Sequence, residues 1–147
     1  MDLKQILAEW ETDSAIERNF LDEASRVTPS LHAKYLALLM NSKLKLKDAE
    51  FKQKVLLKDK WLYYNGKMSQ EAIEAKGWDP DPLDGLKILK GEMDYYYDSD
   101  QDIIESEAKI QYIKTCIDTL QEIIDNLKWR HQTIRNMIEW RRFESGA

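Results

Sequence analysis

The sequence predicts an all-α protein built from two long helices. No glycine or proline appears between Pro29 and Gly66, and none appears between Asp100 and Gly146. The second of these stretches repeats apolar residues every seven positions, and no stretch alternates polar and apolar residues over a strand's length. We therefore expect an elongated arrangement of two helices, at about residues 29–65 and 100–143, joined by a loop-rich connector.

Shorter helical segments are expected before the first long helix. One is indicated by apolar residues at the i, i+3, i+4 and i+7 spacing of a helix face, namely Leu3, Ile6, Leu7 and Trp10. Ser14 and Glu17 have the spacing of a capping box, which predicts that a second helix begins there. Thr28 and Pro29 then fit the N-cap and first turn of the long helix, because proline loses nothing there by lacking an N–H.

The connector covers residues 67–99 and is rich in residues that form loops. It holds three of the five glycines and two of the three prolines. A chain of 147 residues is most simply one domain. We therefore expect a single helical domain with three parts, which are residues 1–66, the connector and residues 100–147.

The C-terminal helix carries a coiled-coil seam of isoleucine and leucine at heptad a and d positions. Its partner is left open, with equal weight on the first long helix of the same chain and on other copies, and both can hold at once. Further apolar residues outside the seam, such as Ile104 and Ile123, favour homo-oligomerisation. The predicted oligomerisation residues are Ile110, Ile113, Ile117, Leu120, Ile124, Leu127, Ile134 and Ile138.

No pattern in the sequence predicts an active site, a metal site or a cofactor, so we expect a protein that is not an enzyme. His32, His131 and the single cysteine, Cys116, lack zinc-site spacing. The acidic run 94–102 lacks the glycine and distal glutamate of a calcium loop, so we expect it to be solvated. One cysteine, no signal peptide and no long apolar run predict a cytoplasmic protein without a membrane partner.

A basic segment stands out against the overall net charge of -5. Residues 43–67 contain eight lysines and three acidic residues, a local charge of +5. On a helical wheel, four of these lysines fall in a strip about 60° wide that includes Trp61, and they are Lys43, Lys47, Lys54 and Lys58. Beside this strip lies an apolar seam that we expect to be buried, formed by Leu44, Phe51, Val55 and Leu62.

The segment ends in LKDKWLYYNGK, residues 57–67, which contains three lysines and three aromatic residues. Lysines neutralise phosphates and rings stack on bases without sequence choice, a combination that suits single-stranded nucleic acid. A single aromatic ring is more often part of a hydrophobic core, so the residues are compatible both with core packing and with nucleic-acid binding. Tyr63 and Tyr64 point about 100° apart on a helix, so both are not expected in one narrow core. The predicted nucleic-acid-binding residues are Lys54, Lys58, Lys60, Trp61, Tyr63, Tyr64 and Lys67.

The same stretch resembles a Leu-Lys-x-basic-Leu-x-Tyr-Tyr-x-Gly segment of the UvsY family, the recombination mediator proteins of T-even-like phages. KGEMDYYYDSDQDIIESEAKIQY and IRNMIEWRRFESGA are similar to the family's approach to its C-terminal helix and to its ending. The likeness runs from about Leu21 to Gly146, although residues 67–90 match poorly. Lys60 stands where the family can have arginine, and Trp61 where it can have leucine.

The resemblance implies a non-enzymatic protein that binds single-stranded DNA and assembles through its C-terminal helix into a ring of six or seven copies. Its implied partners are a RecA-like recombinase and a single-strand-binding protein, because family members help load the former onto DNA coated by the latter. By motif position, Lys58 and Lys60 carry over as DNA contacts. The alternative is a structural coiled-coil protein that binds other proteins and no nucleic acid.

Overall fold

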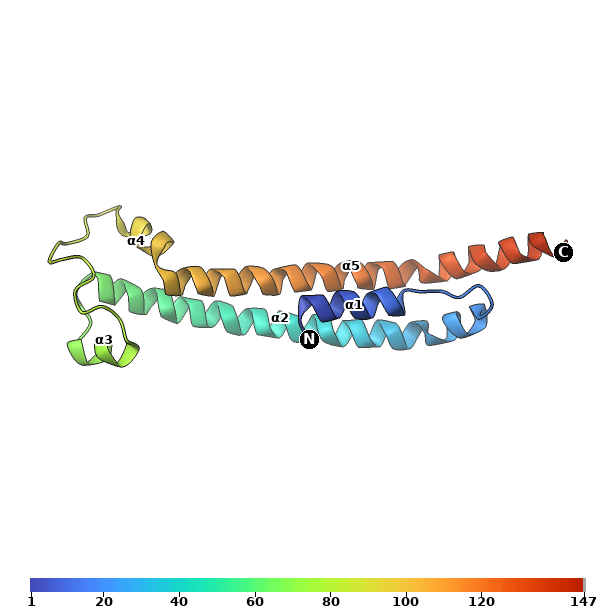
Figure 1. The fold of residues 1–147 in the computed structure, drawn as a ribbon, viewed down its shortest axis with the longest axis horizontal. Helices are drawn as coiled ribbons and strands as arrows, with labels where there is room; N and C mark the ends of the chain where they lie inside the picture. Colours follow the sequence, from blue (N-terminus) through green and yellow to red (C-terminus); the bar gives the residue numbers. More distant parts are fainter. Residues whose placement is uncertain (147) are drawn as a thin grey trace. The chain divides into compact units, whose positions relative to one another are not determined.

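The computed structural model describes residues 1–146, which form five α-helices and no strand (Figure 1). The two long helices are α2, Leu21–Tyr64, and α5, Gln101–Glu144. The three short helices are α1, Leu3–Asp13, α3, Gln70–Lys76, and α4, Met93–Ser99. The predicted all-α class, with two long helices and a connector between them, is confirmed.

The chain divides into two compact units whose boundaries fall inside the long helices. Unit 1 comprises Met1–Lys45 and Tyr112–Ala147, and unit 2 comprises Leu46–Gln111. The helices α2 and α5 therefore each contribute residues to both units, and the connector with α3 and α4 belongs wholly to unit 2. The single domain expected for residues 1–147 stays a prediction.

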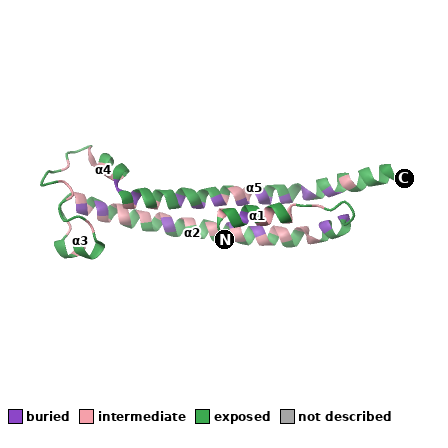
Figure 2. Ribbon diagram, in the orientation of Figure 1, coloured by how far each residue is buried: buried purple, intermediate pink, exposed green. Residues whose placement is uncertain are grey.

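The core of unit 1 forms where α1 packs on α2 and α5, and Figure 2 shows buried positions on all three helices. Tyr35 and Leu120 are fully shielded from solvent, and the Trp10 ring meets the Tyr35 ring edge-on with centroids 5.5 Å apart. The buried cluster comprises Ile6, Tyr35, Leu39, Cys116, Leu120, Ile123, Ile124 and Leu127. The heptad seam of α5 supplies three of the cluster's five α5 side chains, Leu120, Ile124 and Leu127, so this part of the seam packs within its own chain.

Six of the eight predicted oligomerisation side chains are buried in the single chain, and these are Ile110, Ile113, Leu120, Ile124, Leu127 and Ile134. Ile117 is partly buried against the unit 1 core, whereas Ile138 is 41% exposed. The six buried side chains have found partners inside the chain, so they face another copy only if the helices separate. Their predicted role between copies stays a prediction.

The N-terminal boundaries differ from those expected. Ser14 is the C-cap of α1, where its N–H bonds to the carbonyl of Trp10, so no helix begins there. The helix α2 begins at Leu21, and Pro29 lies inside it, beyond the first turn. Buried Leu21 and Ala24 hold the extra turns, and packing thereby outweighs the backbone hydrogen bond that proline cannot donate.

The apolar seam expected to be buried on α2 is largely exposed. Leu44, Phe51 and Val55 are 70%, 59% and 57% exposed. The helix instead buries another face, which includes Tyr35 in unit 1 and Ala49 in unit 2. The helical wheel was built on the large aliphatic residues and Phe51, whereas the buried face of α2 also uses tyrosine, alanine and a lysine beside its leucines.

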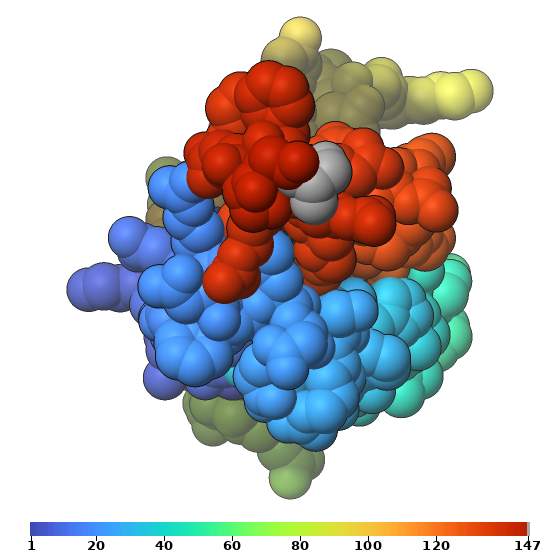
Figure 3. Space-filling model, turned by 90° about the vertical axis from the view of Figure 1, so that its right-hand side faces the viewer, coloured from blue at the N-terminus to red at the C-terminus, as the bar shows by residue number. Residues whose placement is uncertain are grey.

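The end of unit 1 is closed by contacts between the α1–α2 loop and the last turns of α5. Figure 3 looks onto this end, with the loop in blue and the end of α5 in red. Arg18 donates to the Glu144 carboxylate at 2.5 Å, and the Arg141 guanidinium donates to the Arg18 carbonyl at 3.3 Å. These pairs are exposed, so each contributes on the order of 1 kcal/mol or less.

Candidate nucleic-acid interface

One exposed side of the end of α2 gathers lysines around a tryptophan. Lys54, Lys58 and Trp61 follow the i, i+4, i+7 spacing that places them on one helix face. The Lys58 side chain is 68% exposed and Trp61 is 40% exposed. Lys67 lies just past the helix, with its Nζ 4.6 Å from the centre of the Trp61 ring. We call these four residues the basic-aromatic face.

The charges of the basic-aromatic face are only weakly held by carboxylates. Lys58 Nζ lies 3.6 Å from an Asp59 carboxylate oxygen, and Lys54 Nζ lies 5.6 Å from the centre of the exposed Phe51 ring. Exposed contacts of this kind contribute about 1 kcal/mol or less. The ammonium groups can therefore exchange these contacts for a phosphate at little cost.

The helix end itself brings Lys67 back over Trp61. Gly66 has a φ of 68°, the left-handed conformation that glycine adopts without strain. The Lys67 N–H then bonds to the carbonyl of Leu62 at 2.8 Å, which closes the last turn in the manner of a Schellman cap. The predicted Asn65–Gly66 stop therefore also determines where Lys67 lies.

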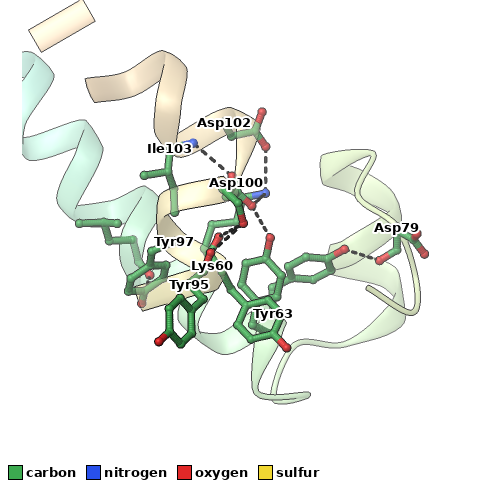
Figure 4. A network of polar contacts seen from close by, with 12 residues as sticks. Lys60, Tyr63, Asp79, Tyr95, Tyr97, Asp100, Asp102 and Ile103 are labelled. Carbon is green, nitrogen blue, oxygen red and sulfur yellow. Dashed lines mark hydrogen bonds and ion pairs between the residues drawn. The ribbon is translucent and has the colours of Figure 1, made fainter. Parts of the chain in front are cut away.

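Lys60 does not belong to this exposed face. Lys60 is only 4% exposed. Its Nζ lies 3.0 Å from a carboxylate oxygen of Asp100 and 2.9 Å from one of Asp102 (Figure 4). The same Nζ lies 3.8 Å from the centre of the Trp78 ring. The sequence predicted Lys60 as a DNA contact, but here two carboxylates and an indole occupy its ammonium group.

Asp100 is the centre of this buried network. One carboxylate oxygen accepts hydrogen bonds from Lys60 Nζ and from the Tyr64 hydroxyl at 2.5 Å, and the other accepts from the Ile103 N–H at 3.1 Å. Burial raises the pKa of Asp100, but the bonds from Tyr64, Lys60 and Ile103 outweigh it and leave the pKa below its ordinary value. Asp100 therefore stays ionised, and its bond to Ile103 caps the start of α5.

Both tyrosines of the motif enter one cluster, contrary to the sequence expectation. Tyr63 is 5% exposed and its hydroxyl donates to the Asp79 carbonyl at 2.5 Å. The Tyr63 ring lies 4.9 Å from that of Trp78 and 5.0 Å from that of Tyr64. Both fit because the connector folds around the last turn of α2 and gives each ring its own wall, Trp78 for Tyr63 and Tyr96 for Tyr64.

Sequence reasoning missed the residues that hold Lys60, which are Trp78, Asp100 and Asp102. The acidic run was expected to be solvated, yet Asp100 is 7% exposed. One signal was available, because an aspartate three residues before Ile103 at the start of a helix has N-cap spacing. Trp78 follows the Gly77 cap of α3 in the connector, and no local pattern points it toward Lys60.

The part of the chain that the structure describes contains neither a metal-binding cluster nor a membrane-spanning helix. Residues 1–146 hold no group of three or more histidine, cysteine, aspartate or glutamate side chains arranged for a metal ion. Over the same residues, none of the helices combines the length and the apolar character needed to cross a membrane.

Comparison with known proteins places the chain in a family. Residues 9–147 match the family model described as "Recombination, repair and ssDNA binding protein UvsY". The recombination protein uvsY of Enterobacteria phage T4 is 25% identical over 146 residues, which covers 99% of each chain. Crystal structures of the bacteriophage T4 recombination mediator protein UvsY superpose with TM-scores of 0.81 and 0.80, at 23% identity, over 98% or more of each chain. The resemblance to the UvsY family is thereby confirmed, and the chain belongs to this family of recombination, repair and single-stranded DNA-binding proteins.

Proposed function

We propose that this protein binds single-stranded DNA through its basic-aromatic face. In this role it helps a RecA-like recombinase assemble on DNA coated by a single-strand-binding protein, in the cytoplasm of a phage-infected bacterium. The observation that carries the proposal is the exposed grouping of Lys54, Lys58, Trp61 and Lys67 on one side of α2, in a member of a family described as binding single-stranded DNA.

The chemistry of the face fits a flexible strand better than a duplex. Its lysines can neutralise phosphates, and Trp61 offers a partly exposed ring on which a base of any sequence can stack. In a duplex the bases are already stacked, so Trp61 would have no base face to meet. Lys60, Tyr63 and Tyr64 are not part of this proposed contact surface because their polar groups are bonded inside unit 2.

Homo-oligomerisation would multiply this modest face. Several exposed side chains of α5 in unit 1 are large and hydrophobic, and they include Trp129, Ile138, Trp140 and Phe143. The Trp140 and Phe143 rings stack with centroids 5.4 Å apart. Exposed apolar surface of this kind suits contact with another copy. A ring of six or seven copies would array as many faces along one strand and raise the affinity without new contacts.

The DNA-binding face is tested with the double variant Lys58→Ala and Lys67→Ala. Its control is Lys87→Ala with Lys90→Ala, which removes the same charge from exposed positions of the connector. Affinity for fluorescent oligo-dT is measured by anisotropy over a range of salt concentrations. Loss of two phosphate contacts should weaken binding and flatten the salt slope by about 1.4, at about 0.7 for each contact. Equal behaviour of the two double variants would contradict the proposed face.

The assembly is tested by light scattering on Trp140→Ala with Phe143→Ala. The control pair is Leu86→Ala with Leu89→Ala, which removes exposed apolar side chains from the connector. We expect the α5 pair to lower the measured mass and the connector pair to leave it unchanged. An unchanged mass in the α5 variant would show that copies meet elsewhere.

A structural coiled-coil protein without nucleic-acid binding is the second candidate. It is favoured by the burial of Lys60 and Tyr63, which gives these two motif residues a role inside the fold. Wild-type protein discriminates between the two candidates without any variant. Salt-dependent binding of oligo-dT supports the first, and no binding at low salt supports the second.

A further inference from the structure

Within unit 2, the two motif lysines Lys58 and Lys60 differ completely in their surroundings. The Lys58 side chain is 68% exposed and has one carboxylate contact at 3.6 Å. The Lys60 side chain is 5% exposed and has two carboxylate contacts, at 3.0 Å and 2.9 Å. Two carboxylates contact the Lys60 ammonium group and the Trp78 ring lies 3.8 Å from its Nζ, so this buried group is shielded from a phosphate.

We propose that Lys60 and Asp100 are positioning residues for DNA binding, which act by holding the exposed side chains of the basic-aromatic face rather than by touching the strand. This inference rests on the proposed function and assigns a new role within it. Lys60 lies one residue before Trp61 on α2, and Asp100 caps the start of α5 by accepting from the Ile103 N–H. It therefore joins the helix end that presents the face to the helix that follows the connector.

The contacts around the pair explain how it orients the face. Asp100 also accepts from Tyr64, which lies three residues after Trp61 and two before Gly66. Figure 4 shows Lys60 beside Asp100. Lys60 and Tyr64, both on the last turns of α2, bond to the same Asp100 carboxylate oxygen. With both bonds in place, α2 stays helical up to Tyr64, and the turn at Gly66 sets Lys67 over Trp61.

Breaking the Lys60–Asp100 pair disorders the end of α2, because one buried charge is left without its partner. If Lys60 loses its charge, Asp100 becomes a buried carboxylate without its cation, and the unit must open to hydrate it. The end of α2 is then free to fray, so the ring and the ammonium of the face no longer meet a strand together. Affinity falls although every exposed lysine remains.

Salt dependence separates a positioning residue from a phosphate contact. Losing one phosphate contact to single-stranded DNA flattens the slope of log affinity against log salt by about 0.7. Losing a positioning residue weakens binding at every salt concentration and leaves the slope unchanged. We expect Lys58→Ala to show the first behaviour. We expect Lys60→Met, which keeps the aliphatic stem, to show the second, with affinity lowered about tenfold, the effect of losing one stacked base.

Asp100→Asn tests the positioning role against a purely electrostatic effect, because the two predict opposite changes in DNA affinity. Removing a negative charge near a polyanion site by itself strengthens binding. The positioning role predicts weaker binding, because Lys60 loses its buried partner. The exposed Asp98 provides the matched control, and Asp98→Asn should bind oligo-dT as tightly as the wild type or slightly more tightly.

The double variant Lys60→Met with Asp100→Asn removes both buried charges and keeps an acceptor for Tyr64. We expect it to recover most of the affinity lost in Lys60→Met with the wild-type salt slope, whereas a direct Lys60 contact predicts only the slight gain from the removed negative charge and a slope that stays flattened. If Lys60→Met fails to fold by circular dichroism, Asp100→Asn and the double variant carry the test. Two results would overturn the inference, namely a flattened slope in Lys60→Met and tighter binding in Asp100→Asn. If the wild type itself does not bind oligo-dT, the proposed function and this inference fail together.

Discussion

Each unit of the molecule contains an aspartate that binds a lysine and a tyrosine of α2, but only one of these networks is closed to solvent. In unit 1, Asp13 accepts from Lys34 Nζ and from the Tyr35 hydroxyl, both at 2.7 Å. In unit 2, Asp100 accepts from Lys60 and Tyr64 in the same way. The donors and acceptors are alike, so the networks differ mainly in how much water reaches them.

The lysines show the difference most clearly. The Lys34 side chain is 37% exposed, whereas that of Lys60 is 5% exposed. Water and salt can replace the partners of the first lysine but not those of the second. The comparison teaches that residue type and spacing do not decide whether a lysine serves a ligand or the fold. Its burial and the carboxylates it meets decide this.

The largest predicted effect is on the stability of the two lysine variants. Lys60→Ala leaves a buried carboxylate without its cation and should cost about 3–5 kcal/mol of unfolding free energy. Lys34→Ala removes a partly exposed pair and should cost about 1 kcal/mol or less. Urea denaturation followed by circular dichroism measures both. Equal losses would mean that the two networks are equally hydrated.

A second prediction compares the buried and exposed parts of the α5 seam in unit 1. Leu120 is fully buried, so Leu120→Ala should lower the unfolding free energy by about 2–5 kcal/mol. Ile138 is 41% exposed, so Ile138→Ala should change it by about 0.5 kcal/mol or less in the single chain. Thermal unfolding at low protein concentration provides the comparison. A large loss in Ile138→Ala would indicate that it is buried between copies.

The tyrosines provide the third prediction, in which the networks should behave alike. Burial and the hydrogen bond to an aspartate raise the pKa of both Tyr35 and Tyr64. Tyr35→Phe and Tyr64→Phe each remove a hydrogen bond to a charged acceptor, so each should cost about 1.5–3 kcal/mol. Chemical denaturation near neutral pH measures the two losses. A much smaller loss in Tyr64→Phe would show that Lys60 alone holds Asp100.

The fourth and smallest prediction concerns acid. The pKa of Asp100 and that of Asp13 lie below the ordinary value, despite burial that raises both, because lysine and tyrosine bond to the ionised forms. A lowered pKa adds stability above the unfolded pKa of about 3.9, and this stability is lost as the pH falls through the folded pKa. Asp100→Asn should therefore lose less stability than the wild type between about pH 5 and pH 2. Parallel pH curves would contradict this assignment.

Most of the fold could be predicted from the sequence because its signals are local. The absence of glycine and proline, the heptads of α5 and the Asn65–Gly66 stop correctly indicated two long helices and the end of α2. The start of α2 could not be found this way. Thr28 and Pro29 have the local pattern of a helix start, yet α2 already begins at Leu21, where buried Leu21 and Ala24 hold the preceding turns.

The candidate site was predicted only in part, because exposure depends on residues far away in the chain. The lysine strip with Lys58 and Trp61 followed from helical geometry alone. The burial of Lys60 depends on Asp100, forty residues later, and on a connector that folds back over the helix end. No local pattern contains that information, so the motif lysines Lys58 and Lys60 looked equivalent in the sequence.

Lysine footprinting tests the central claim most directly. An acetylating reagent followed by mass spectrometry reports how fast each lysine reacts in the folded protein, with and without oligo-dT. We predict that Lys54, Lys58 and Lys67 react quickly and become protected by oligo-dT, and that Lys60 reacts slowly in both states. The exposed Lys87 should react quickly in both and serves as the control. If Lys60 reacts as fast as Lys58 in the free protein and is protected by DNA, the division between binding and positioning lysines is wrong.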